Sequence, residues 1–577
     1  MTSEELCAYV EEVDKWVKRD GFHAKNINAY VQASKAFLSN FNDVPTAMEL
    51  TRKSKMGLQQ IVYNQRKESI LDTAQTVQCL GVHVPEIDLM WECLRVEAPY
   101  LFDSYMLFLE KNRQPKDKFY YPRRDCLQKL GIIQDLQDLE DDVLDIYSLS
   151  LPPGTGKTTL EKFFATWVIG RWSREYSLFF SHSDDITRMF YDGVLSITTD
   201  NMEYLWDLVF PNLKLRKTDA ARQQIDFGKE KAFWSLQCSS RGSSNAGKVR
   251  ASKYLYVDDL IGGIEEAMNP AFLDKLYRIY STDAKQRKLN QYTKELHVAT
   301  RWSTRDVIGR LQLLHEGNPR ARFKAVPDID PKTGKSNFNY RINGMNEEFF
   351  HDQELAMDDV TYRCLYKNEP IEREGRLYTE DNIMTYLTMP AAEPDAVVSI
   401  VDTKSKGTDF LVCPCFKQYG DKYYLDISSI CTDSSDYGVQ YERIARMYVS
   451  QGVQSAEFES NAGGDRVAFE VDKLVKEMGG TCNITTKYTE TNKETRIIIY
   501  ADWVKKHVYF PDKSLYNPKS DVGTFMYWLF AYTISGKNIH DDVPDCLANF
   551  AKHVDQQNRV ARVEVPLNPY KMFLRGY

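Results

Sequence analysis

The sequence lacks the features of a membrane or secreted protein. It has no apolar run long enough to span a bilayer, and residues Met1 to Glu5 carry no secretory leader. Its 11 cysteines are scattered, and the one close pair, Cys413 and Cys415, has no second pair or nearby histidine at metal-binding spacing. We therefore expect reduced thiols in a cytoplasm and no membrane partner.

The sequence also lacks an excess of positive charge. It has 74 lysine and arginine residues against 82 aspartate and glutamate residues, a formal net charge of −8. Proteins that hold DNA tightly are usually basic over the contacting face, so this charge counts against storage on DNA. Local basic tracks remain, and the candidates are Lys214, Arg216 and Lys217; Lys285, Arg287 and Lys288; and Lys505 with Lys506. Each track is equally compatible with an ordinary solvated face.

What the sequence does have is enough apolar surface for several cores. Its 577 residues are 43% hydrophobic and 27% charged, with no internal repeat and no low-complexity tract. This length predicts about three to four domains, each able to bury its own core.

One loop has the residues that hold the phosphates of a nucleotide. The apolar run from Val143 to Leu151 predicts a buried strand, and residues 160–172 predict a helix after the loop. The residues predicted to bind ATP are Gly154, Thr155, Gly156, Lys157, Thr158 and Thr159. In such a loop the glycines turn backbone N–H groups toward the phosphates, the lysine contacts them, and the threonine hydroxyl binds Mg²⁺. The usual first glycine of the pattern is replaced by Leu151.

A downstream strand supplies the carboxylates that an ATPase needs. The run Lys253 to Asp259 is apolar and ends in two aspartates. We expect Asp258 to hold Mg²⁺ and Asp259 to polarise the attacking water. Glu265 or Glu266 could polarise the water instead of Asp259. Without the phosphate loop, an apolar run that ends in two aspartates could equally be an ordinary strand end.

Other segments near these motifs are candidates for supporting roles. A third strand, Leu296 to Trp302, carries Thr300, which we expect to sense the γ-phosphate, although a strand-end turn fits equally. The segment Phe119 to Arg124 offers rings and cations for adenine, with a surface helix start as the alternative. The arginines that are candidates for stabilising the transition state are Arg241, Arg250, Arg301 and Arg310. We favour Arg250, as a residue that reaches a neighbouring subunit, because it lies just upstream of the strand that ends in Asp258 and Asp259.

The last third of the chain predicts a nuclease. Residues 395–402, 410–416, 422–430 and 454–458 predict strands, with a helix from Tyr437 to Gln451 before the fourth. This is the order of an RNase H-like fold, in which carboxylates from strand one, strand four and a late helix converge. The predicted catalytic and metal-binding residues are Asp402, Glu459, Asp542 and Asp545, with Asp409 and Asp541 as further candidates. Such carboxylates favour two Mg²⁺ or Mn²⁺ ions that cut a phosphodiester. Taken singly, each of these acidic residues is more often a strand cap or a solvated side chain than a metal ligand.

These motifs, in this order, resemble the large subunit of a tailed-bacteriophage terminase, a DNA-packaging motor. The matching stretches are residues 149–159, 179–183, 257–259, 299–302, 309–311, 369–377, 458–464 and 540–545. The resemblance covers about three quarters of the chain, residues 115–555. The departures are Leu151 and an aspartate, Asp259, where the family has glutamate.

The resemblance implies a function and a set of partners. We expect ATP hydrolysis to drive double-stranded DNA into a procapsid, and the nuclease to cut concatemeric DNA at the start and end of packaging. The implied partners are the portal protein, the terminase small subunit and further copies of the chain in a ring. The implied location is the host cytoplasm and transiently the portal, not the mature virion. A helicase-nuclease for repair is the alternative, against which no strand-separation motif is found.

The placement of the motifs predicts the domains of an α/β chain. Residues 1–110 are predicted to be a helical region, and residues 111–365 a P-loop ATPase domain with a mostly parallel sheet. Residues 366–394 are predicted to be a linker strap, and residues 395–577 the RNase H-like nuclease domain.

Overall fold

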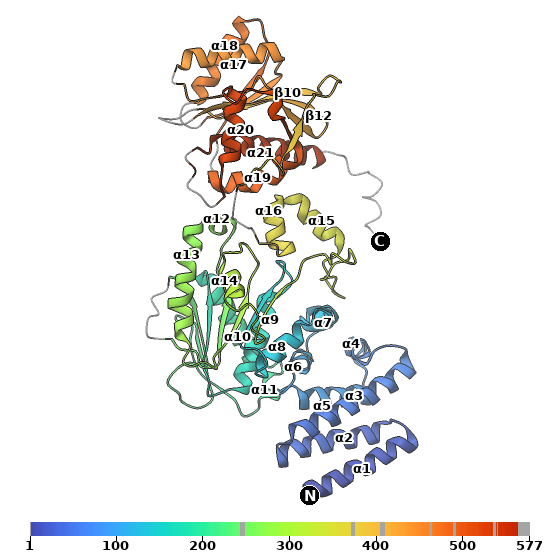
Figure 1. Cartoon of the computed structure of the whole chain (residues 1–577). Helices are drawn as coiled ribbons and strands as arrows, with labels where there is room; N and C mark the ends of the chain where they lie inside the picture. The colour runs from blue at the N-terminus through green and yellow to red at the C-terminus, as the bar shows by residue number, and fades with distance from the viewer. Residues whose placement is uncertain are drawn as a thin grey trace. The chain divides into compact units, whose positions relative to one another are not determined.

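A computed structural model gives the fold of the chain (Figure 1). The structure describes residues 2–242, 249–370, 376–403, 410–434, 436–460, 464–488, 492–534, 538 and 540–563. Two compact units follow from the contacts within the chain. The first unit contains Met1–Gly262, Ala271–Phe350 and Cys364–Glu369, and the second contains Gly263–Pro270, His351–Arg363 and Pro370–Tyr577. Among the described residues, no helix is both long and apolar enough to cross a bilayer.

The first unit begins with helices, as predicted for residues 1–110. They are α1 (Ser3–Asp20), α2 (Ala24–Ala36), η1 (Phe37–Phe41), α3 (Val44–Arg66), α4 (Ile70–Leu80), α5 (Pro85–Glu97) and α6 (Phe102–Leu109). Thr2 and Glu5 form a capping box at the start of α1, which satisfies backbone N–H groups that the helix leaves unpaired. Leu6, Val13 and Tyr30 are buried in the core between α1 and α2. The contacts place these helices in the same unit as the following sheet, so the boundary at residue 110 stays a prediction.

The rest of the first unit is built on an eight-stranded sheet. Its strands are β1 (Ile146–Ser150), β2 (Ser177–Ser181), β3 (Leu215–Asp219), β4 (Gln224–Phe227), β5 (Leu236–Ser240), β6 (Tyr254–Asp258), β7 (Lys294–Val298) and β8 (Ala321–Ala325). Their order is β3-β4-β5-β2-β6-β7-β1-β8, and only the pairings of β4 with β3 and β5 are antiparallel. The predicted mostly parallel sheet is confirmed.

Helices lie between these strands in the sequence, and those within Gly263–Pro270 and His351–Arg363 belong to the second unit. From residue 115 to residue 367 they are η2 (Pro115–Asp117), α7 (Tyr120–Lys129), α8 (Ile132–Glu140), α9 (Lys157–Arg171), α10 (Asp184–Thr199), α11 (Trp206–Val209), α12 (Ile264–Ala267), α13 (Pro270–Ile279), η3 (Tyr280–Ala284), η4 (Lys285–Arg287), α14 (Val307–Leu314), α15 (Glu347–Ala356), α16 (Asp359–Tyr362) and η5 (Arg363–Lys367). Every residue of β1, β2, β6 and β7 is buried. Burial of every residue fits a parallel sheet that is covered on both faces, although β7 also buries the polar residues Lys294, Glu295 and His297.

The order of the strands brings the predicted ATPase motifs to one edge. β7 pairs with β6 on one side and β1 on the other, all in parallel. Their carboxyl ends therefore meet at the same edge of the sheet, where ligands of open α/β sheets bind. The third motif strand ends at Val298, so Thr300 lies in the loop that follows it.

The second unit has a seven-stranded sheet and a separate pair of strands. The sheet, in the order β16-β15-β10-β12-β13-β17-β9, contains β9 (Met384–Tyr386), β10 (Ala396–Val401), β12 (Cys415–Tyr419), β13 (Lys422–Leu425), β15 (Ser455–Glu459), β16 (Asn483–Lys487) and β17 (Val508–Pro511), and the pair is β11 (Leu411–Cys413) with β14 (Ile430–Thr432). Its helices are α17 (Tyr437–Gln451), α18 (Gly464–Glu477), α19 (Lys493–His507), η7 (Lys513–Leu515), α20 (Asp521–Ala531) and α21 (Asp542–Val563). β10 is parallel to β15 and antiparallel to β12.

Alternating side chains of β10 pack against helices on opposite faces of this sheet. Val397 and Val401 belong to the core that contains α17 and α18. Ile400 belongs to the other core, with α19, α20 and α21. The two groups of helices lie on either side of the sheet in Figure 1. Successive side chains of a strand point to opposite faces of the sheet, so helices cover the end of β10 on both faces.

The predicted second and third strands of the nuclease are each divided. The run Phe410 to Phe416 forms β11 and β12, which are separated at Pro414. The run Lys422 to Ile430 forms β13 and ends where β14 begins. Proline has no N–H to donate to a ladder, so Pro414 interrupts the pairing and β11 joins a different partner. Predicting one uninterrupted strand here was therefore wrong.

Part of the predicted linker contributes to the core of the second unit. Leu377, Tyr378 and Ile383 are buried among residues of α19, α20 and α21. β9 extends the sheet by pairing with β17. The compact unit therefore extends toward the N-terminus beyond the predicted boundary at residue 395.

Candidate functional site

The phosphate loop lies between β1 and α9 in the first unit. Gly154 and Gly156 have φ values of 77° and 98°, in the left-handed region that glycine adopts without strain. A Cβ atom at Gly156 would lie 2.5 Å from the Phe119 ring, so this position excludes any side chain. Helix α9 begins at Lys157, one turn earlier than predicted, because Gly156 is its N-terminal cap. Its first N–H groups are therefore placed at the loop, where a helix N-terminus favours an anion.

Lys157 explains why Leu151 can replace the first glycine of the pattern. The Lys157 Nζ donates to the backbone carbonyl of Leu151 at 2.8 Å. This contact needs only a carbonyl oxygen, and Leu151 is not among the residues with positive φ. Its side chain is buried in the core. Burial lowers the pKa of Lys157, while the nearby charges of Asp259 and Asp258 favour the ammonium form.

Thr158 and Asp258, the residues predicted to hold Mg²⁺, lie in direct contact. The Thr158 hydroxyl donates to Asp258 Oδ2 at 2.9 Å. Asp258 Oδ1 is buried and has no hydrogen-bond partner among the described residues. Burial, together with the charge of Asp259, raises the pKa of Asp258 to about 7. A hydroxyl and an unpartnered carboxylate oxygen at one point are the hard ligands that Mg²⁺ prefers, so these residues fit the ion.

Asp259 is tied to the loop that follows β7. It has a φ of 32°, which is unusual for a residue with a side chain. Its Oδ1 accepts the backbone N–H of Thr300 at 3.1 Å, and its own N–H donates to Val298 at 3.0 Å. The alternative water-activating residues, Glu265 and Glu266, lie on α12, which belongs to the second unit. The identity of the water-activating carboxylate stays a prediction.

Buried Glu161 in α9 was not predicted from the sequence. Both of its carboxyl oxygens lack a hydrogen-bond partner within the described part of the chain. Burial raises its pKa well above the usual range, and the charges of Asp258 and Asp259 add to this shift. An acidic residue four positions after Lys157 has no sequence pattern that would have identified it.

The aromatic segment predicted for adenine borders the phosphate loop. The Arg123 guanidinium lies 4.7 Å from the ring centroids of both Phe119 and Tyr340. The Tyr340 hydroxyl donates to the backbone carbonyl of Thr155 at 3.1 Å. Tyr340 was not predicted, because it lies 185 residues along the chain from Thr155. Phe119 and Tyr340 therefore form two walls beside the loop.

The four candidate arginines have partners within the first unit. Arg241 donates to Leu260 at 2.9 Å, Arg250 to Gln286 at 3.5 Å, Arg301 to Gln312 at 3.2 Å, and Arg310 to Arg305 at 2.9 Å and to Asp274. Arg301 is also buried, with an ion pair to Asp306 at 3.4 Å. The choice of Arg250 as the residue that reaches a neighbouring subunit stays a prediction.

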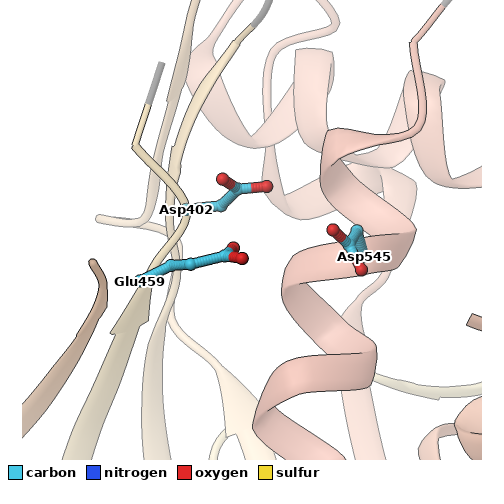
Figure 2. A group of neighbouring side chains, drawn as sticks. All are labelled: Asp402, Glu459 and Asp545. Carbon is cyan, nitrogen blue, oxygen red and sulfur yellow. The ribbon is translucent and has the colours of Figure 1, made fainter. Parts of the chain in front are cut away.

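The second unit contains a cluster of three carboxylates. Asp402 directly follows β10, Glu459 ends β15, and Asp545 lies in the first turn of α21. Figure 2 shows the three side chains pointing toward one another, and one oxygen from each lies within 4.8 Å of the other two. Asp402 is fixed in place because it exchanges backbone hydrogen bonds with Val412, at 3.0 and 3.1 Å. Three of the predicted nuclease residues are therefore brought together.

The shared negative charge changes the acidity of this cluster. Burial raises the pKa of Asp402 well above its usual range, and the charge of Asp545 adds to the effect. Burial also raises the pKa of Asp545, to about 6, although Arg496 and Lys493 oppose the shift. A divalent cation would relieve this repulsion, and oxygen-only ligands suit Mg²⁺ or Mn²⁺. The donor set therefore fits the predicted metal.

Two cations beside the cluster were missed by sequence reasoning. Lys493 Nζ lies 2.7 Å from Asp541, 3.1 Å from Asp542 and 3.7 Å from Asp545. Arg496 donates through Nε and Nη2 to Asp545 Oδ1, at 2.9 and 2.5 Å. Lys493 and Arg496 are three residues apart in α19, so they lie on one face of that helix. The spacing of three residues between these two cations is the sequence feature that could have identified them.

The remaining predicted nuclease residues are placed differently. Asp542 lies outside the three-carboxylate cluster and accepts the backbone N–H of Phe410 at 3.1 Å. Asp541 is half-exposed and paired with Lys493. Asp409 lies outside the described residues, as do residues 371–375 and 461–463 of the matching stretches.

The candidate basic tracks contain cations that are paired with carboxylates. Arg216 pairs with Asp226 at 2.8 Å, Lys288 with Glu295 at 2.9 Å, and Lys505 with Asp502 at 3.6 Å. These pairs reduce the charge that the three tracks offer to DNA.

Comparisons with known proteins give low similarity throughout. No family model and no curated protein matches the chain. The chain is similar to the solved large terminase of a thermophilic bacteriophage in complex with ADP, at 9% identity and a TM-score of 0.33, covering 75% of this chain and 99% of that one. It is similar to the large terminase of bacteriophage HK97, at 10% identity and a TM-score of 0.30, covering 66% and 84%. It is also similar to the human cytomegalovirus terminase nuclease domain, at 11% identity and a TM-score of 0.25, covering 32% and 98%. Similarity this low does not indicate a function, so a functional proposal depends on the residues of the two sites.

Proposed function

We propose that this chain is the motor and nuclease of a viral DNA-packaging machine. The observation that carries the proposal is the presence of two sites for phosphate chemistry in one chain. One is the phosphate loop with its bonded Thr158 and Asp258. The other is the cluster of Asp402, Glu459 and Asp545. ATP hydrolysis joined to metal-dependent DNA cutting is the combination that packaging requires.

The first unit supplies the ATPase. Gly154, Gly156 and the start of α9 direct backbone N–H groups toward the phosphates, and Lys157 neutralises their charge. Thr158 and Asp258 would hold Mg²⁺, which would supply positive charge to the phosphates of the nucleotide. Asp259 orients the attacking water. Its bond to Thr300 links that carboxylate to the loop after β7, so nucleotide state is transmitted to this loop.

The second unit supplies the endonuclease. Asp402, Glu459 and Asp545 hold divalent metal, with Asp542 as a further ligand when the site is filled. Two such ions, when bound, supply an activated water and stabilise the leaving 3′-oxygen of a phosphodiester. The protein contributes fixed geometry: Val412 holds Asp402, and Arg496 holds Asp545. The site cuts concatemeric DNA when packaging begins and ends.

The proposal includes partners outside the chain. The motor acts on double-stranded DNA, docks on the portal protein of a procapsid as a homo-oligomeric ring, and is brought to DNA by a small subunit. It works in the host cytoplasm and leaves before the virion matures. The net charge of −8 suits a motor that repeatedly releases and regrips DNA.

The test separates the two activities with one variant each. Purified protein is incubated with linear and supercoiled DNA, with Mn²⁺ or EDTA, and with or without ATP. We expect Lys157→Ala to lose ATP hydrolysis and keep Mn²⁺-dependent cutting, and Asp402→Ala to do the reverse, because each residue contacts only its own site. Cutting in EDTA, or ATP turnover in Lys157→Ala, would remove the corresponding site from the proposal.

Packaging itself requires a second assay. The protein is mixed with procapsids, DNA and ATP, and packaged DNA is measured as the fraction protected from added nuclease. We expect Lys157→Ala to protect no DNA. Protection that does not depend on ATP would contradict the motor role while leaving the nuclease in place.

A further inference from the structure

Lys493 lies among carboxylates beside the cluster of Asp402, Glu459 and Asp545. Its ammonium contacts oxygens of Asp541, Asp542 and Asp545, which lie in or next to the first turn of α21. Three carboxylates around one cation is the arrangement that a hard divalent ion takes. The lysine thus supplies a single positive charge directly beside the cluster of Asp402, Glu459 and Asp545.

The neighbouring arginine is fixed, whereas the lysine is not. The Arg496 side chain is 4% exposed, and two of its nitrogens bond to one oxygen of Asp545. The Lys493 side chain is 35% exposed and lies at the first position of α19. A flexible, partly solvated ammonium exchanges partners readily, whereas a buried bidentate guanidinium does not. Lys493 is therefore the cation that can leave.

We infer that Lys493 fills the place of the second metal ion in the DNA-free protein. In that state Asp402, Glu459 and Asp545 bind a single divalent ion. A second ion near Asp541 and Asp542 is excluded because the ammonium already occupies the carboxylate oxygens that the ion would bind. A DNA phosphate delivered to the site draws Lys493 away, and the second ion then enters. This inference rests on the proposed nuclease function.

The consequence is a nuclease whose metal site is completed by its substrate. Two-ion chemistry then starts only where a phosphate lies against α19 and α21. Lys493 is a positioning residue in this scheme, since it acts through the carboxylates and the DNA phosphate.

The experiment counts bound Mn²⁺ by the loss of the free-ion paramagnetic resonance signal. Full-length protein without nucleotide is used, in an Asp258→Asn background that removes the phosphate-loop carboxylate. We expect about one bound ion without DNA and about one more when a short DNA duplex is added. Lys493→Met should bind the additional ion without DNA, whereas Lys493→Arg, which keeps the charge, should not.

The controls separate this inference from the function on which it rests. Lys476→Met, in an exposed pair with Asp472 on α18, should bind Mn²⁺ like the parent protein. Asp402→Asn should lose the first ion, and unchanged binding in that variant would overturn the proposed metal centre itself. Two ions bound by the parent without DNA, or no additional ion in Lys493→Met, would overturn only the role of Lys493. If Lys493→Met does not fold, the number of Mn²⁺ ions that the parent protein binds with and without DNA still tests the role of Lys493.

Discussion

At the scale of single residues, burial decides the protonation of the carboxyl groups at both sites. Asp258 is buried beside Asp259, and its pKa is raised to about 7 although Thr158 and Lys157 oppose the shift. Asp545 has two cationic partners and its pKa is still raised, to about 6. Metal ligands of this kind must lose a proton before they bind, so metal affinity at each site depends on pH.

The first prediction concerns the pH dependence of Mg²⁺–ATP binding. Below about pH 7 Asp258 holds a proton that the metal must displace, so affinity should rise by up to about tenfold per pH unit from pH 6 to 7 and then level off. The same raised pKa means that the free energy of unfolding of the nucleotide-free protein should fall as pH rises from about 4 to 7, because unfolding releases that proton. Calorimetric titrations in two buffers measure the proton release. Binding that does not vary between pH 6 and 8 would contradict the assignment.

The second prediction separates the candidates for water activation. Asp259→Asn should leave nucleotide affinity nearly unchanged and lower the ATP turnover number by about two orders of magnitude or more, if Asp259 orients the water. The conservative change keeps an oxygen that can accept the Thr300 N–H, so the loop after β7 should stay in place. Glu265→Gln and Glu266→Gln are the matched controls. The role passes to whichever glutamine variant shows the large loss instead.

At the scale of elements, the nuclease depends on how α19 is held against α21. The two helices share a core that includes Ile497, Val504, Leu547 and Ala551. Arg496 and Asp545 form a buried ion pair across this contact. Removing one partner of such a pair leaves the other charge buried without compensation.

The third prediction follows from this pair. Arg496→Met should lower the free energy of unfolding by about 3 to 5 kcal/mol, because it leaves Asp545 buried among carboxylates. Mn²⁺ should restore part of the loss, since the ion supplies the missing positive charge. Thermal melting with and without Mn²⁺ measures both effects. Arg446→Met, which breaks an exposed pair with Glu442 on α17, should cost less than about 1 kcal/mol. Equal losses of unfolding free energy in the two variants would show that the buried ion pair stabilises the protein no more than the exposed pair does.

At the scale of the whole molecule, the second unit is larger than the nuclease predicted from its motifs. Its core includes Leu377, Tyr378 and Ile383, and its sheet ends in β9. A fragment that starts after these residues exposes the apolar surface that they cover. The limits of an independent nuclease are therefore set by packing and not by the first catalytic strand.

The fourth prediction compares two fragments. Residues 391–577, which contain every nuclease motif, should fold less stably than residues 376–577. The loss of three buried side chains and an edge strand should cost several kcal/mol, at about 1.5 to 3 kcal/mol for each large apolar side chain. Urea unfolding measures the difference, and both fragments should cut DNA with Mn²⁺ and no ATP wherever they are folded. Equal stability would place the boundary near residue 395, as the motifs alone predict.

Much of this protein follows from the sequence, because local patterns determine it. The strand, glycine-rich turn and helix around Lys157 are encoded by adjacent residues, and so is α17, whose predicted limits, Tyr437 and Gln451, are those observed. The α/β class follows from the alternation of such segments. Asp402, Glu459 and Asp545 were identified because each one ends a strand or begins a helix in a known order. Patterns of this kind can be recognised without knowing the tertiary packing.

Only the tertiary structure decided which distant side chains share a site. Tyr340 meets Thr155, Lys493 meets Asp541, and Arg496 meets Asp545 across long stretches of chain. It also divided a predicted strand at Pro414 and added β9 to the second unit. The physical reason is that ion pairing, desolvation and sheet pairing depend on distances in space. A sequence states which charges exist, but burial and approach determine their partners and their pKa values.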